Sequence, residues 1–154
     1  MSSSPKPHTS PSQETRVFVA LLKASDRLSQ QAEQVIKQHG LTGSQYNVLR
    51  ILRGAEPAGL PCKGISDRMI SHDPDMTRLL DRLEKRGLIT RERQSEDRRV
   101  VKTRITAQGL QTLKKLDVPV LNLHRKQFRN IDAAQLKNLA AMLEQIFPET
   151  PEQG

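Results

Sequence analysis

The sequence predicts a mainly α-helical protein with one small β-hairpin. Only 3% of its 154 residues are aromatic, so a core must be built from aliphatic side chains. Such a core suits helices packed on helices better than a β-sandwich. Apolar residues recur at spacings of three and four along most of the chain, and two strand-like segments flank a polar turn within residues 88–105. The length suits one domain.

The two ends of the chain differ in composition from its middle. Residues 1–13 are rich in Ser and Pro, and residues 148–154 are similar. Segments with so few large apolar side chains cannot offset the entropy lost on ordering. We therefore expect a disordered tail over residues 1–13, a flexible tail over residues 148–154, and the domain over residues 14–147.

A long first helix is expected over about residues 14–38, ending at Gly40. Its apolar stripe consists of Val17, Leu21, Ala24, Leu28, Ala32 and Val35. Phe18, Leu22 and Ile36 widen this stripe beyond what a lone surface helix needs. The width predicts a helix that is buried on two sides.

Two further helices should follow. Thr42 and Gln45 fit a capping box at the start of a second helix that ends at Gly54. Residues 54–61 are expected to form a turn-rich connection. Pro61 suits the first turn of a short third helix over about residues 61–69.

The fourth helix carries arginines on one face. Asp73 is a suitable N-cap, Pro74 a suitable first helical residue, and Gly87 ends the helix. Its apolar face consists of Met76, Leu79, Leu80 and Leu83. The opposite face is polar and contains Thr77, Arg78 and Arg82, beside Asp75 and Asp81.

The remainder predicts a hairpin and two terminal helices. Strands are expected at about residues 88–93 and 100–105, joined by a polar turn. Thr106 should cap a long helix that is broken or bent near Pro119. Asp132 should cap a last helix, whose apolar face consists of Leu136, Leu139, Leu143 and Ile146.

The charge favours a polyanionic partner. The chain has 25 Lys and Arg against 17 Asp and Glu, for a net charge of +8. Eight basic residues face three acidic ones within residues 85–104. A charged turn that serves only solubility explains charge, but not an excess of one sign on a small hairpin. Phosphate contact explains it.

A short helix, a turn and a helix with an arginine face predict a helix-turn-helix. The major groove admits one α-helix, and residues near its N-terminal end reach the bases. Here these are Thr77, Arg78 and, one turn on, Arg82. The alternative is a solvated face on which the arginines pair with Asp75 and Asp81. The adjoining basic hairpin favours DNA contact.

Other functional classes have little support in the sequence. No paired carboxylates, nucleophile elbow or phosphate-binding glycine loop is visible, so we expect no enzyme and no cofactor. Cys62 is the only cysteine, and we interpret it as a small buried residue. The four histidines are scattered, so no metal site is expected. No bilayer-length apolar stretch or signal sequence occurs, which predicts a cytoplasmic protein.

Three runs resemble one known family. The run Asp97–Gly109, DRRVVKTRITAQG, resembles the wing motif of the MarR (multiple antibiotic resistance regulator) family, with Ile105 in place of a leucine. Residues 77–88, TRLLDRLEKRGL, are similar to the recognition helix and first wing strand of that family. Residues 41–49, LTGSQYNVL, resemble its second helix.

The resemblance implies a winged helix-turn-helix, with the helix-turn-helix at about residues 61–86 and the wing at about 88–105. The terminal helices, at about residues 14–38 and 106–147, would form a dimerisation domain. It further implies a ligand-responsive repressor that binds a pseudo-palindromic double-stranded operator as a homodimer. The implied effector is a small aromatic or phenolic molecule, bound between the dimer helices and the winged domain.

The resemblance also assigns roles to individual residues. Arg99 would enter the minor groove, Asp97 would orient it by a salt bridge, and Arg98 would face phosphate. The complete set of expected DNA-binding residues is Thr77, Arg78, Arg82, Arg86, Asp97, Arg98 and Arg99. Two alternatives remain open at this point: a non-specific architectural nucleic-acid-binding protein, and a winged-helix module that binds protein.

Overall fold

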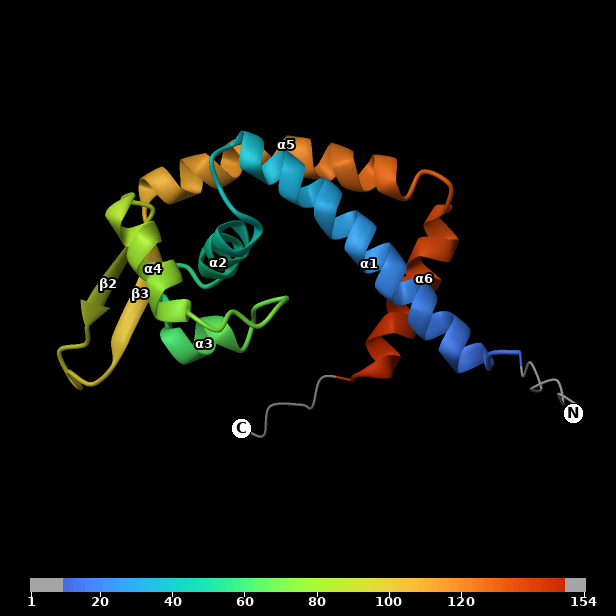
Figure 1. Ribbon diagram of the computed structural model, residues 1–154. Coiled ribbons are helices and arrows are strands. Elements are labelled where there is room, and N and C mark those ends of the chain that lie inside the picture. Colours follow the sequence, from blue (N-terminus) through green and yellow to red (C-terminus); the bar gives the residue numbers. More distant parts are fainter. Residues whose placement is uncertain (1–9, 149–154) are drawn as a thin grey trace, which may run out of the picture.

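The computed structural model describes residues 10–148, and it is mainly helical with one small sheet (Figure 1). The helices are α1 (Gln13–Gln38), α2 (Gly43–Gly54), α3 (Cys62–Ser66), α4 (Met76–Lys85), α5 (Ala107–Gln127) and α6 (Ala133–Ile146). The strands are β1 (Leu60–Pro61), β2 (Ile89–Arg93) and β3 (Val101–Ile105). This arrangement confirms the predicted mainly helical class with a hairpin wing.

The hydrophobic core lies in the winged half of the molecule. It is formed by buried aliphatic side chains of α2, α3, α4, the sheet and the first part of α5, with Ile36 as the contribution of α1. The sheet is antiparallel with the order β1-β3-β2. Thr103 at its centre lies opposite Leu60 on one side and Arg91 on the other.

The long helices extend away from this core. In Figure 1, α5 runs from the wing across the top of the molecule to α6, and α1 slopes down from the middle of α5 toward the side on which α6 lies. Helices α1 and α5 contact each other, and both contact α2. The described part of the chain has no buried side chain in α6. One end of the molecule therefore has a core, and the other presents uncovered helices.

Most of the predicted helix starts are confirmed. Thr42 and Gln45 form the expected capping box on α2, and Asp132 forms another with Gln135 on α6. Thr106 caps α5 by accepting a hydrogen bond from the Gly109 amide.

The predicted start of the fourth helix is wrong. The N-cap of α4 is Asp75, whose carboxylate accepts the Arg78 amide at 3.1 Å. Asp73 accepts the Asp75 amide at 2.9 Å instead. This two-residue contact is an Asx-type turn, which places Asp73 and Pro74 in the loop before the helix.

The third helix and the fifth also differ from expectation. Helix α3 is only five residues long, and the chain before it pairs with β3 as the unpredicted strand β1. Helix α5 continues through Pro119, so the break that was one of the two expected outcomes there does not occur. Proline removes only its own amide donor, and the buried Leu113, Leu116 and Val120 hold the helix against the core on both sides of it.

The N-terminal end of the described chain is more ordered than predicted. Helix α1 begins at Gln13 with Ser12 as its N-cap, so the end of the predicted N-terminal tail is ordered as a helix start. Residues 1–9 and 149–154 of the two predicted tails lie outside the described residues. Within residues 10–148, none of the helices combines the length and the apolar character needed to cross a bilayer.

Candidate DNA-binding surface

Helix α4 is anchored by one face and exposed by the other. Its inner face consists of Met76, Leu79, Leu80 and Leu83, all buried as predicted. A Gly87 backbone with φ of 72° ends the helix, where the Gly87 and Leu88 amides donate to the last carbonyls of α4. The winged core therefore holds the helix firmly and presents its polar face outward.

The polar face of α4 contains three of the predicted DNA contacts. Thr77, Arg78 and Arg82 are all exposed. The Arg78 Nε atom lies 4.0 Å from the Asp75 carboxylate, at the limit of an ion pair, and both side chains are mostly exposed. An exposed pair of this kind contributes little, so Arg78 can exchange Asp75 for phosphate or a base edge at small cost.

Arg86 differs from the other predicted contacts. Its Nη1 atom donates to the Gln45 Oε1 atom at 3.3 Å, and its guanidinium lies against Gly40. Gln45 also belongs to the capping box of α2. The structure thus places Arg86 at the α1–α2 corner, away from the face that Thr77 and Arg82 present.

The wing turn is held by backbone contacts of its own. The Asp97 carboxylate accepts the Arg99 amide at 3.0 Å, and the Arg93 guanidinium donates to the Arg98 carbonyl at 3.1 Å. Among residues 10–148, no ion pair joins the side chains of Asp97 and Arg99, so the expected salt bridge is not formed. Asp97 shapes the turn, and the side chains of Arg98 and Arg99 stay exposed at its tip.

Arg91 is a residue whose role the sequence reasoning missed. It is one of the eight basic residues whose charge predicts phosphate contact, but its guanidinium donates to Asp81 at 2.5 Å and to Glu84 at 2.6 Å, both on α4. Its side chain is only 23% exposed. The hydrogen bond to Glu84 is the main cause that raises the pKa of Arg91. No signal in the sequence marks Arg91 among its basic neighbours.

Cys62 lies at the surface, which contradicts its interpretation as a buried residue. Helix α3 is one and a half turns long, and its single buried side chain is Ile65. The helix therefore turns its first residue outward. Across residues 10–148, His, Cys, Asp and Glu side chains form no cluster of three or more that could hold a metal ion.

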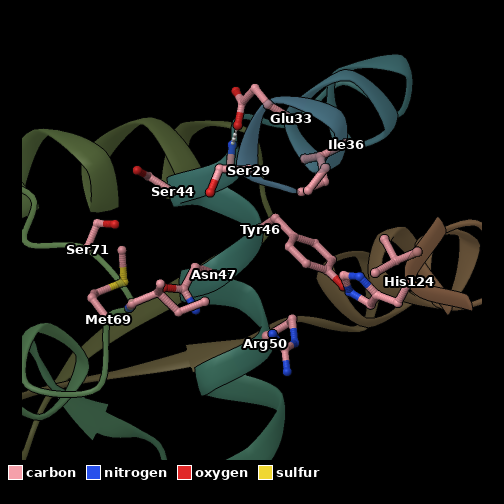
Figure 2. Close-up of a pocket in the computed structure, with 14 residues that line it drawn as sticks. Ser29, Glu33, Ile36, Ser44, Tyr46, Asn47, Arg50, Met69, Ser71 and His124 are labelled. Atoms are coloured by element: carbon pink, nitrogen blue, oxygen red, sulfur yellow. Dashed lines mark hydrogen bonds between the residues drawn. The ribbon is translucent and has the colours of Figure 1, made fainter. Parts of the chain in front are cut away.

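A pocket of about 300 Å³ opens between α1, α2, α5 and the loop before α4 (Figure 2). Ile36, Val120 and Met69 contribute apolar surface. Tyr46 points toward His124 in Figure 2, and the Arg50 guanidinium lies 5.8 Å from the centre of the Tyr46 ring. Burial raises the pKa of the Tyr46 phenol. The pocket combines an apolar wall with a few polar groups, as small-molecule sites do.

Comparison with known proteins agrees with this geometry. The family model described as "MarR family" matches residues 41–101, from the start of α2 into β3. A solved MarR transcription factor from Planctomyces limnophilus is 37% identical, with a TM-score of 0.67, and the match covers 89% of this chain and 99% of the other. The chain belongs to the MarR family.

Two other matches widen the comparison for this MarR-family protein. The transcriptional repressor IacR of Pseudomonas putida is 29% identical over 130 residues, which cover 84% of this chain and 77% of IacR. A mutant MarR from E. coli, solved in complex with operator DNA, is 20% identical with a TM-score of 0.77, and the match covers 86% of this chain and 94% of that one. This last likeness shows the shared winged fold. The protein is a MarR-family transcriptional regulator, and its relatives are regulators of transcription.

Proposed function

We propose that this MarR-family regulator is a cytoplasmic, homodimeric repressor that reads a pseudo-palindromic operator and acts by binding, without catalysis. One observation carries the proposal. The exposed face of α4, with Thr77, Arg78 and Arg82, is joined within one folded unit to a wing whose tip presents Arg98 and Arg99. A helix of this width fits the major groove, and a wing arginine fits the narrow minor groove beside it.

Uncovered apolar surface supports the dimer. Phe18 and Leu22 of α1 are 61% and 56% exposed, and Ile146 and Phe147 at the end of α6 are 50% and 88% exposed. Helix α6 is amphipathic yet has no buried residue. A helix of this kind needs a second surface to cover its apolar stripe, and a second copy of the chain supplies it symmetrically.

The twofold symmetry of the dimer determines the orientation and spacing of the operator half-sites. Each protomer presents one α4, and two copies related by a twofold axis require inverted half-sites. Half-sites about 34 Å apart, or about one helical turn, place both reading helices on one face of the duplex. Of the seven predicted contacts, Arg86 now has the weakest claim, because Gln45 holds its guanidinium.

The pocket supports regulation by a small aromatic or phenolic effector. Tyr46, Arg50 and His124 line one part of it, and they can stack on a ring or bond to a hydroxyl. The loop that leads into α4 lines another part through Met69, Ile70 and Ser71. An effector that binds one arrangement of α4 better than another shifts the population away from the DNA-binding arrangement.

The test uses fluorescence anisotropy with the promoter duplex that flanks the protein's own gene. Wild type should bind this duplex far more tightly than a scrambled duplex of equal length, typically by at least about 10³-fold. Equal binding would support a non-specific architectural protein, and no binding to either duplex would support a protein-interaction module.

The wing assignment is tested in the same assay by Arg99→Ala. If each protomer loses one phosphate-neutralising charge, the slope of log K against log salt should fall by about 2 per dimer. Lys23→Ala on α1 removes the same charge from an exposed site distant from the wing and should leave the slope unchanged. An unchanged slope for Arg99→Ala would refute the role of the wing arginine.

A further inference from the structure

Arg91 is a basic residue of the wing whose guanidinium is already bound within the protein. Its guanidinium contacts Asp81 and Glu84 together, at 2.5 Å and 2.6 Å, and the side chain is the most covered partner in either pair. Both carboxylates belong to α4, whereas Arg91 is the central residue of β2. One side chain thus connects the two DNA-facing elements directly.

The Arg91 ion pairs restrain the orientation of β2 relative to α4. Helix α4 and strand β2 are joined by a single turn at Gly87, a residue type that by itself permits a wide range of backbone angles. Arg91 lies two residues into β2, beyond that turn, and bridges back to α4 over seven and ten residues. A planar guanidinium that contacts two carboxylates restricts both distance and direction.

From this geometry we infer that Arg91 is a positioning residue, which fixes the wing relative to the recognition helix so that Arg99 and Arg82 meet neighbouring grooves at one set separation. The inference rests on the proposed DNA-binding function and deepens it. Arg91 itself makes no DNA contact in this account. Its contribution to operator binding passes through the wing tip.

Arg91 also has an electrostatic effect on α4, which the test must separate from its positioning effect. Asp81 and Glu84 are two negative charges on a helix that approaches phosphates, and Arg91 neutralises part of that charge. Removing Arg91 alone would both free the wing and expose the two carboxylates. A loss of affinity in that variant therefore has two sources.

Three variants separate positioning from charge. Arg91→Met keeps the apolar stem and removes the bridge. Arg91→Met combined with Asp81→Asn and Glu84→Gln removes the bridge and the exposed carboxylates together. Arg104→Met removes one exposed positive charge from β3 and leaves the contacts of Arg91 in place. Each is measured below its unfolding temperature, on the operator duplex and on the scrambled duplex.

The triple variant distinguishes a positioning role of Arg91 from a charge effect. If Arg91 positions the wing, the triple variant should still bind the operator at least about tenfold more weakly than wild type, the loss expected when a specific contact is no longer made. Its binding to the scrambled duplex should not weaken. Arg104→Met should weaken binding to both duplexes by the same factor. Operator affinity restored to the wild-type value in the triple variant would overturn the positioning role.

A double-mutant cycle with Arg99→Ala gives a readout that general destabilisation does not move. Arg99→Ala should weaken operator binding in wild type and change it less than twofold in the triple variant, because the unpositioned wing no longer delivers Arg99. Fully additive effects would contradict the inference. Failure of wild type itself to prefer the operator would instead refute the proposed function, so the two failures are distinguishable.

Discussion

Thr106 links the end of α4 to the start of α5, and its hydroxyl makes two hydrogen bonds at that junction. It donates to the Gly87 carbonyl at 2.7 Å, just beyond the end of α4. It also accepts the Gly109 amide at 3.0 Å as the N-cap of α5. Thr106→Val replaces the hydroxyl by a methyl group of nearly the same size, so packing is kept and both bonds are lost.

The cost of this substitution follows from the two bonds. Loss of an N-cap side chain costs about 1 kcal/mol. Loss of the bond to Gly87 adds about 0.5 kcal/mol, at the low end of a net hydrogen bond, because Gly87 is exposed and water replaces the donor. The total of about 1.5 kcal/mol corresponds to a fall in Tm of about 3–6 °C for a chain of this length.

The assay is thermal unfolding followed by circular dichroism at equal protein concentration, because the Tm of the proposed dimer would depend on concentration. Thr106→Ser is the matched control, since serine keeps the hydroxyl and caps helices as well as threonine. A Thr106→Val protein that unfolds within about 1 °C of wild type, or a Thr106→Ser protein that loses as much, would refute the reasoning.

Two further predictions concern the pocket and the dimer. Burial raises the pKa of Tyr46 above its usual value near 10, so the neutral phenol stabilises the fold below that pH and the contribution disappears as the pH rises through the raised pKa. Tyr46→Phe should therefore lose less stability than wild type in urea unfolding between about pH 9 and pH 12, and an identical loss would contradict this. Phe18→Glu places a charge on the exposed apolar face of α1 and should convert the dimer to a monomer in sedimentation velocity. The exposed Lys23→Glu on the same helix should stay dimeric, and dimers in both would remove Phe18 from the interface.

The elements that carry function were predictable where a local pattern defined them. The buried and exposed faces of α4 follow from the helical spacing of four apolar residues, and the structure buries all four. The turns at Gly40 and Gly87 adopt φ of 77° and 72°, which glycine alone adopts readily. Periodicity, caps and glycine turns act within a few residues, so the sequence shows them directly.

Three predictions failed where residue type and spacing do not decide the structure. Strand β1 is two residues long and exists because β3 pairs with it from more than forty residues away. Asp73 and Asp75 are equally good caps by residue type, and only the loop geometry decides between them. Cys62 is exposed because it lies on the outer side of α3, whose one buried side chain is Ile65. Only the pairing of β1 is set by contacts distant in the chain, and the choice of cap is a local matter of loop conformation.

The basic hairpin shows most clearly what the local sequence does not predict. Arginines that look alike in the sequence have different roles in the fold. Arg91 is bound to two carboxylates of α4, Arg93 supports the backbone of the wing turn, and Arg98 and Arg99 remain exposed at the tip. A count of positive charge therefore overstates what the wing offers to phosphate. Two of these four arginines shape the wing and the other two stay exposed at its tip. Under the proposed function, the affinity of this protein for its operator should therefore depend on residues that do not contact DNA.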